Sequence, residues 1–120
     1  MNILFVSTHL NAGGITSYLF TMAKGLARRG HHVHVATSGG NMEEEFSSVG
    51  VKLLTLNIRT KSELDPRIYF ALFPLARYIR ENNIDLIHAQ TRITQVMGVW
   101  LKKMTGVPFI STCHGFFKTR

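Results

Sequence analysis

The sequence has little cysteine, little acidic charge and no long apolar run. Its single cysteine, Cys113, excludes an internal disulfide and agrees with a reducing compartment. The longest apolar stretch, from Ile68 to Ala76, is far shorter than the roughly 20 residues that a membrane-spanning helix needs. Met1 leads straight into a short apolar run, without the basic flank, long apolar region and cleavage site of a secretory signal. We therefore expect a cytoplasmic protein.

Acidic residues are scarce, because seven Asp and Glu stand against 14 Lys and Arg, for a formal net charge of +7. Such a balance favours anionic partners, among them a nucleotide, an acidic sugar or an anionic membrane. The basic residues are spread along the chain, so general solvation explains most of them, and we expect no nucleic-acid partner. Residues 59–80 differ, since they interleave basic with aromatic and aliphatic side chains. That segment is either a core-facing helix with solvated basic residues or a site of contact with an anionic membrane.

Metal binding has little support, although the chain has six histidines. His32 and His34 would share one face of a strand, but the nearby sequence offers no acidic or thiol side chain to complete a zinc site. We therefore expect no metal.

Strand and helix patterns alternate over the 120 residues, which is enough chain for one domain with a core. The expected strands are 3–6, 31–37, 51–56, 84–89 and 108–113, and the expected helices are 15–29, 42–49, 66–82 and 91–105. Three of these helices are followed by Gly30, Gly50 and Gly106, where a left-handed cap belongs. The alternation predicts an α/β, Rossmann-like, doubly wound parallel sheet of five strands, for which we choose the order 3-2-1-4-5.

Three elements carry more detailed expectations. Pro66 occupies the first position of the helix 66–82, and Pro74 inside it should kink the axis near Phe70. The strand 31–37 should pack its β-branched residues on one face and its histidines on the other. The inner side of the helix 91–105 is expected to consist of Val96, Met97, Trp100, Leu101 and Met104.

A glycine turn after the first strand is the most informative motif. Residues 7–14 separate the apolar run 3–6 from an amphipathic run that begins at Ile15. A turn in this place aims unpaired backbone N–H groups, and the positive end of the helix dipole, at an anion that is usually a phosphate. Gly13 and Gly14 match neither the dinucleotide fingerprint nor the Walker motif. The alternative interpretation is a tight turn that needs positive φ and close packing.

Two histidines close expected strands at the carboxyl edge of the sheet, where doubly wound proteins bind their ligands. His114, followed by Gly115, is predicted to contact ligand on the same edge as Gly13 and Gly14. His88 fits a hydrogen-bonded structural role as well as a functional one. A receiver-type signalling domain shares this layout but is excluded, because the chain lacks the acidic residues that such a domain needs after the first and third strands.

Six segments together resemble the N-terminal domain of the two-domain, GT-B-fold glycosyltransferases of family 4. They are residues 1–6 (MNILFV), 11–14 (NAGG), 26–33 (LARRGHHV), 84–89 (IDLIHA), 106–108 (GVP) and 112–117 (TCHGFF), in the order of the family. The resemblance implies that residues 1–120 are a partial, acceptor-binding N-terminal domain. It also implies that the C-terminal donor-binding domain, which carries a Glu-x7-Glu motif, is absent.

The resemblance also implies roles for individual residues. Amides around Gly13 and Gly14 would face the donor diphosphate, and His114 would be a catalytic residue near the transferred sugar. Arg92 would bind acceptor or phosphate, and His88 joins the expected substrate-binding set. The family often has His-Ala-His where this chain has residues 88–90, and Gln90 replaces the last histidine.

The implied reaction is transfer of a sugar from a nucleotide sugar to an acceptor hydroxyl with retention of configuration. Its acceptor would be a glycan or lipid of the cell envelope, and it would use no metal and no cofactor besides the nucleotide-sugar co-substrate. The protein would be cytoplasmic, with peripheral contact at the inner membrane face, and the fragment is expected to be inactive without the donor domain. The alternative is a stand-alone nucleotide- or anion-binding module without catalysis. A coding sequence that continues into a second αβ domain would favour the enzyme, and a stop codon after Arg120 would favour the module.

Overall fold

The chain folds around one parallel β-sheet in a computed structural model that describes residues 1–11, 13–56, 66–90 and 92–111. Strands and helices alternate in these residues: β1 (Asn2–Val6), α1 (Gly14–Arg28), β2 (His32–Thr37), α2 (Glu43–Ser48), β3 (Lys52–Thr55), α3 (Pro66–Glu81), β4 (Leu86–Ala89), α4 (Arg92–Thr105) and β5 (Phe109–Ser111). The five strands lie in the order β3-β2-β1-β4-β5, and all four pairings are parallel. The predicted fold class and strand order are confirmed.

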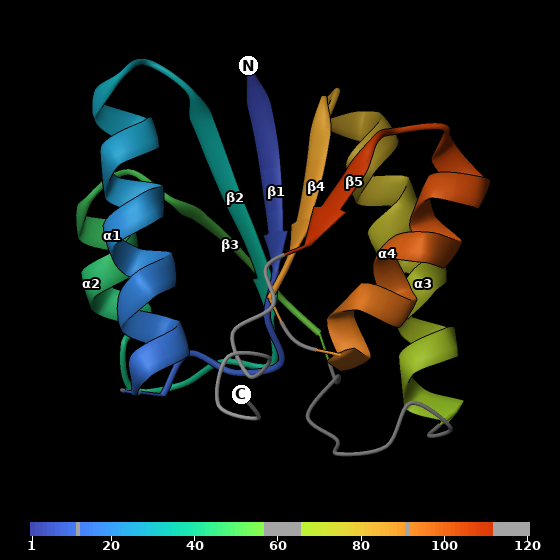
Figure 1. Cartoon of the computed structure of the whole chain (residues 1–120), viewed down its shortest axis with the longest axis horizontal. Coiled ribbons are helices and arrows are strands. Elements are labelled where there is room, and N and C mark those ends of the chain that lie inside the picture. Colours follow the sequence, from blue (N-terminus) through green and yellow to red (C-terminus); the bar gives the residue numbers. More distant parts are fainter. Residues whose placement is uncertain (12, 57–65, 91, 112–120) are drawn as a thin grey trace, which may run out of the picture.

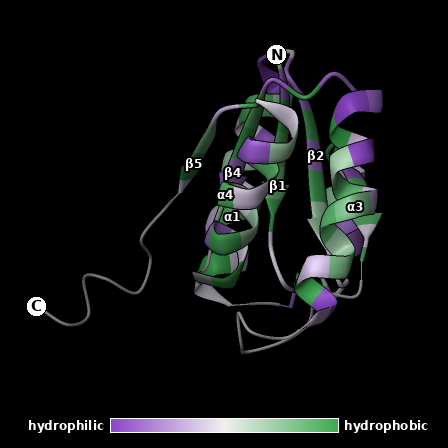
Figure 2. Cartoon of the chain, turned by 90° about the vertical axis from the view of Figure 1, so that its right-hand side faces the viewer, coloured by the Kyte–Doolittle hydropathy of each residue, from purple (hydrophilic) through white to green (hydrophobic). Residues whose placement is uncertain are grey.

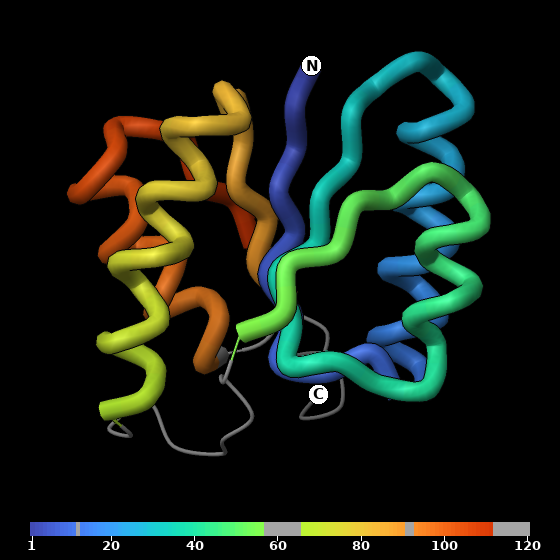
Figure 3. Tube along the Cα trace, turned by 180° about the vertical axis from the view of Figure 1, so that it is seen from behind, coloured from blue at the N-terminus to red at the C-terminus, as the bar shows by residue number. Residues whose placement is uncertain are grey.

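Helices cover the sheet on both sides. Figure 1 shows α1 and α2 on one face of the sheet and α3 and α4 on the other, and Figure 3 shows the same two layers from behind. This division follows from the topology. From β1 the chain adds β2 and β3 on one side and then β4 and β5 on the other. Right-handed crossovers that run in opposite directions along the sheet place their helices on opposite faces. The strands all point the same way, so their carboxyl ends meet at one edge, at the bottom of Figure 1.

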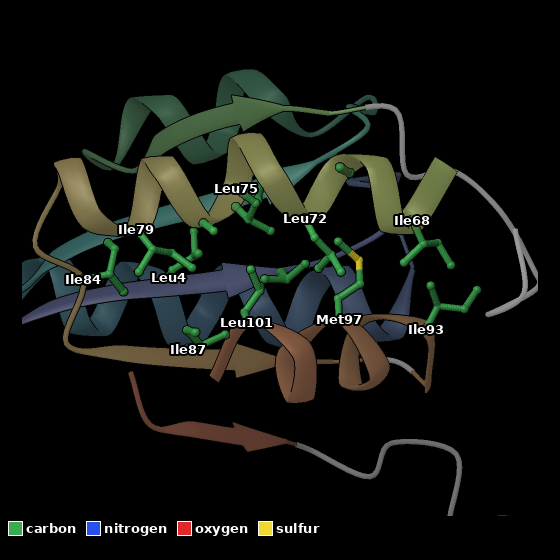
Figure 4. Close-up of a cluster of buried hydrophobic side chains, with 14 residues drawn as sticks. Leu4, Ile68, Leu72, Leu75, Ile79, Ile84, Ile87, Ile93, Met97 and Leu101 are labelled. Atoms are coloured by element: carbon green, nitrogen blue, oxygen red, sulfur yellow. The ribbon is translucent and has the colours of Figure 1, made fainter. Parts of the chain in front are cut away.

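The central strand β1 separates two hydrophobic clusters. Leu4 and Val6 face α3 and α4, whereas Ile3 and Phe5 face α1 and α2, as the two-residue repeat of a strand requires. Figure 2 shows β1 as largely hydrophobic, which is typical of a parallel strand buried on both faces. On the α3 and α4 side, Figure 4 shows side chains of both helices meeting above the sheet.

Several helix ends agree with the sequence. Gly30, Gly50 and Gly106 have φ values of 90°, 89° and 78°, the left-handed conformation expected of residues that close a helix. Pro66 is the first residue of α3, as predicted, and α3 continues through Pro74 to Glu81.

The predicted composition of the inner side of α4 is partly wrong. Met97 and Leu101 are fully buried, one helical turn apart, and Ile93 continues the same stripe. Trp100 is 44% exposed instead, with the Lys103 ammonium 5.3 Å from its ring centroid. The physical reason is angular, because Trp100 lies on the flank of the stripe that Ile93, Met97 and Leu101 form. A further expected inner residue, Val96, is only half-buried.

Val33 and Val35 of β2 pack together on one face of the strand, as predicted, and the other face is buried as well. His34 is 3% exposed, because α3 covers it, and its Nδ1 lies 2.6 Å from the Tyr78 hydroxyl. Burial, followed by the positive charge of Lys52 and by His32, holds the pKa of His34 below its usual value. Burial also raises the pKa of Tyr78.

Candidate anion-binding site

A hollow of about 320 Å³ lies where β1 ends and α1 begins. Seven residues from two short segments line it: Ser7, Thr8, His9, Gly13, Gly14, Ile15 and Thr16. The glycine turn that the sequence singled out therefore opens onto a hollow at the carboxyl edge of the sheet. This is the edge where doubly wound folds bind their ligands.

No side chain caps the first turn of α1. Gly13 occupies the N-cap position, no side chain accepts a hydrogen bond from the turn, and the turn contains no acidic residue. Because first-turn N–H groups have no acceptor within the helix, the amides of residues 14–16 are available to a ligand. The positive end of the α1 dipole lies at the same place, so the hollow favours an anion.

The two glycines are not explained by backbone strain or crowding. Gly13 has extended backbone, with φ of 164°, and Gly14 is not among the glycines with positive φ. A Cβ on Gly14 would meet no atom of the described residues within 4 Å, and a Cβ on Gly13 would lie 4.0 Å from the Asn11 carbonyl oxygen. The interpretation as a tight turn that needs positive φ and close packing is therefore contradicted, and the open space beside both residues is room that a ligand can fill.

The loop after β2 holds the loop after β1 in place. The Leu10 N–H donates to the Gly39 carbonyl at 2.9 Å, and the Met42 N–H donates to the Leu10 carbonyl at 2.9 Å. The Asn41 N–H adds a bond of 3.2 Å to Oδ1 of Asn11. These bonds join segments about 30 residues apart in the chain, and they fix the segment that lines the hollow.

Gly40 allows this close approach of the two loops. A Cβ at Gly40 would lie 2.3 Å from the carbonyl carbon of Leu10 and 2.6 Å from the Asn11 nitrogen. Leu10 is itself fully buried. The hollow is therefore preformed by backbone contacts.

Ser7 and His9 in the hollow form hydrogen bonds through their side chains, whereas the hydroxyls of Thr8 and Thr16 form none with a described residue. The Ser7 hydroxyl donates to the His9 carbonyl at 3.0 Å, and the Asn11 N–H donates to Nδ1 of His9 at 3.2 Å. Thr16 is 2% exposed. Sequence reasoning missed Ser7, His9 and Thr16, although the available signal was their place directly after a strand and at the start of a helix.

The other predicted site residues lie elsewhere. His88 is 6% exposed in the interior of β4, and its ring centroid lies 5.0 Å from that of Phe5. It does not line the hollow, which favours the structural interpretation that the sequence left open. Arg92 is the first residue of α4, after the carboxyl end of β4, and Gln90 is buried at that strand end. The predicted catalytic residue His114 lies outside the described residues.

A second hollow, of about 360 Å³, lies between the end of β3 and the first half of α3. Leu56, Arg67, Phe70, Ala71 and Pro74 line it. Phe70 is 72% exposed, and Phe73, one turn further, is 68% exposed. A core-facing helix with solvated basic residues accounts for the buried stripe of α3, but it does not account for two phenylalanines in solvent. Among the described residues, no helix is long and apolar enough to cross a membrane.

Comparison with solved structures shows the same fold in glycosyltransferases. A glycosyltransferase of Rickettsia africae matches with a TM-score of 0.78, 22% identity, and coverage of 98% of this chain and 32% of that chain. MurG of Acinetobacter baumannii matches with a TM-score of 0.72, 15% identity, and coverage of 92% and 34%. Anabaena HepE, solved in complex with UDP-glucose, matches with a TM-score of 0.69 and 20% identity, and the match covers 92% of this chain and 28% of that chain. This chain thus spans about a third of the length of each.

The search of curated proteins finds no match. The family model described as Glycosyltransferase Family 4 matches residues 12–120, which include the glycine turn, all four helices and four of the five strands. The matched residues include the uncapped start of α1 and one of the two segments that line the hollow. The chain therefore belongs to glycosyltransferase family 4.

Proposed function

We propose that this chain is the N-terminal, acceptor-side part of an enzyme that transfers a sugar from a nucleotide sugar to an acceptor hydroxyl with retention of configuration. Family membership supports transfer of a sugar. HepE, which shares the fold, binds UDP-glucose, and a second structure of it holds UDP and glucose. Because this chain spans about a third of such proteins, the proposal assigns most contacts to the nucleotide to a second domain.

The observation that carries the proposal is the uncapped start of α1, which opens onto the hollow beside two glycines that packing does not require. In the proposed reaction, the bond between the anomeric carbon and the diphosphate oxygen breaks, a bond to the acceptor oxygen forms, and the proton of the acceptor hydroxyl passes to the departing diphosphate. Negative charge grows on the leaving diphosphate as its bond to the sugar breaks. Fixed N–H groups at residues 14–16 stabilise that charge without having to reorganise.

The remaining roles are part of the proposal. His114 would contact the transferred sugar, and Arg92, at the start of α4 on the same edge, would bind acceptor or phosphate. No metal or further cofactor takes part, since the N–H groups and basic residues carry the compensating charge. The acceptor would be a glycan or lipid of the cell envelope.

Peripheral contact with an anionic membrane is supported by α3. The exposed Phe70 and Phe73 lie beside the second hollow, to which Arg67 contributes, and Arg77 on the next turn is exposed. Aromatic side chains enter the interface between headgroups and acyl chains, and arginines pair with lipid phosphates. This contact would place the acceptor side of the enzyme at the cytoplasmic face of the membrane.

Titration of the isotope-labelled chain with UDP, UDP-glucose and inorganic pyrophosphate tests the function, with backbone amide NMR shifts as the readout. We expect shifts at residues 7–9 and 13–16 and a Kd in the millimolar range, equivalent to about 4 kcal/mol, because the other half of the site is missing. Absence of shifts there at tens of millimolar ligand would contradict the site. Micromolar binding of one nucleotide would favour the stand-alone binding module over the enzyme.

A further inference from the structure

Thr16 has an unusual environment for a helical threonine. It is 2% exposed, it lines the hollow, and its hydroxyl forms no hydrogen bond with any described residue. Thr21 and Thr105, by contrast, donate to carbonyls one turn earlier, at 3.1 Å and 2.7 Å. The Thr16 oxygen is not among the buried side-chain atoms that lack a partner, so it is reached from the hollow that Thr16 lines, where it can donate a hydrogen bond. A ligand in the hollow supplies the acceptor.

His9 presents a second donor to the same hollow. Its Nδ1 accepts the Asn11 N–H at 3.2 Å, so the proton of the neutral ring is on Nε2. That bond orients the imidazole, which is exposed and lines the hollow. No acidic side chain is among the described residues that line the hollow. The groups that face it are therefore N–H and O–H donors, the set that fits a phosphate.

We propose that Thr16 and His9 bind phosphate oxygens of the sugar donor, the Thr16 hydroxyl and the His9 Nε2–H each donating one hydrogen bond. This inference rests on the proposed function and adds two side chains to a site built from backbone amides. The backbone amides attract any anion. The two side chains come from the two different segments that line the hollow, so together they select an anion with several oxygens at fixed spacing, such as a diphosphate.

The test measures pyrophosphate affinity by amide NMR shifts in wild type, Thr16→Val, Thr16→Ser and the matched control Thr21→Val. Valine has nearly the shape of threonine and removes the hydroxyl, whereas serine keeps it. We expect Thr16→Val to bind at least about tenfold more weakly, Thr16→Ser to bind within about twofold of wild type, and Thr21→Val to match wild type. Thr16→Val should also unfold close to the wild-type temperature, because the hydroxyl that it removes forms no hydrogen bond with a described residue. Its loss of affinity would then not come from misfolding.

Variants of His9 test the ring nitrogen. The amide of His9→Gln reaches the position of Nε2 and should retain binding, whereas the amide of His9→Asn reaches the position of Nδ1 and should weaken binding about tenfold. Wild-type affinity in both Thr16→Val and His9→Asn would overturn this inference and leave the proposed function intact. Failure of the wild-type chain to bind pyrophosphate or UDP at the hollow would overturn both.

Discussion

Replacing Gly40 with alanine should destabilise the protein at the contact that shapes the hollow. The new Cβ would lie 2.3 Å from the carbonyl carbon, and 2.7 Å from the carbonyl oxygen, of Leu10. These are backbone atoms, so the clash is relieved only if the loop after β1 moves. Overpacking of this kind costs about 1–3 kcal/mol, and loss of the glycine's freedom in the unfolded chain returns about 0.4–1 kcal/mol. The expected net loss is about 1–2 kcal/mol, or a fall in Tm of about 4–8 °C.

The matched control is Gly25→Ala. Gly25 is exposed on α1, and a Cβ there would meet no atom within 4 Å, so alanine should raise stability by about 0.5–1 kcal/mol. Thermal unfolding followed by circular dichroism measures both variants, and the two Tm shifts should have opposite signs. Amide spectra of Gly40→Ala should show displaced resonances at residues 8–11 and weaker binding of pyrophosphate. A Gly40→Ala chain that melts at or above the wild-type temperature would refute the argument that Gly40 is needed for the loop contact.

Three further predictions concern other parts of the chain. Because burial lowers the pKa of His34 below its usual 6.5, the unfolded state binds more protons, so stability should fall as pH drops below about 6.5. His34→Gln should flatten this dependence in chemical denaturation curves, and an unchanged slope would exclude His34 as its source. Phe70→Ser combined with Phe73→Ser should lower binding to anionic vesicles at least about tenfold without changing Tm. Equal binding of the wild type to neutral vesicles, or no weakening with salt, would reject membrane contact. Within the described residues, β5 pairs with β4 alone and Ile110 is 48% exposed, so light scattering should show self-association through residues 107–117. A monodisperse monomer at high concentration would show that this edge is protected.

The order of elements, the fold class and most helix ends could be read from the residues, because local physics decides them. Gly30, Gly50 and Gly106 end helices through a conformation that their own lack of a side chain permits. Pro66 begins α3 because its missing N–H would have had no partner there anyway. The parallel pairing followed from the alternation of strands and helices, whereas the strand order was a choice among those that right-handed crossovers allow, and the structure confirms it. The glycine turn was recognised because its place between a strand and a helix is visible in one dimension.

Features that depend on contacts between distant segments needed the folded structure. Trp100 was assigned the wrong environment, because burial on a helix flank depends on which element packs there. The contact of His34 with Tyr78 likewise depends on the packing of α3 on β2. The hollow itself requires the loop after β2 to fix the loop after β1, through bonds between Leu10 and residues about 30 positions away. The sequence likewise does not predict that the Thr16 hydroxyl lacks a hydrogen-bond partner among the described residues, because threonine is common in the first turn of a helix. Periodicity and capping act over a few residues, whereas the approach of two backbones, the burial of a hydroxyl and the shape of a site are set by packing in three dimensions.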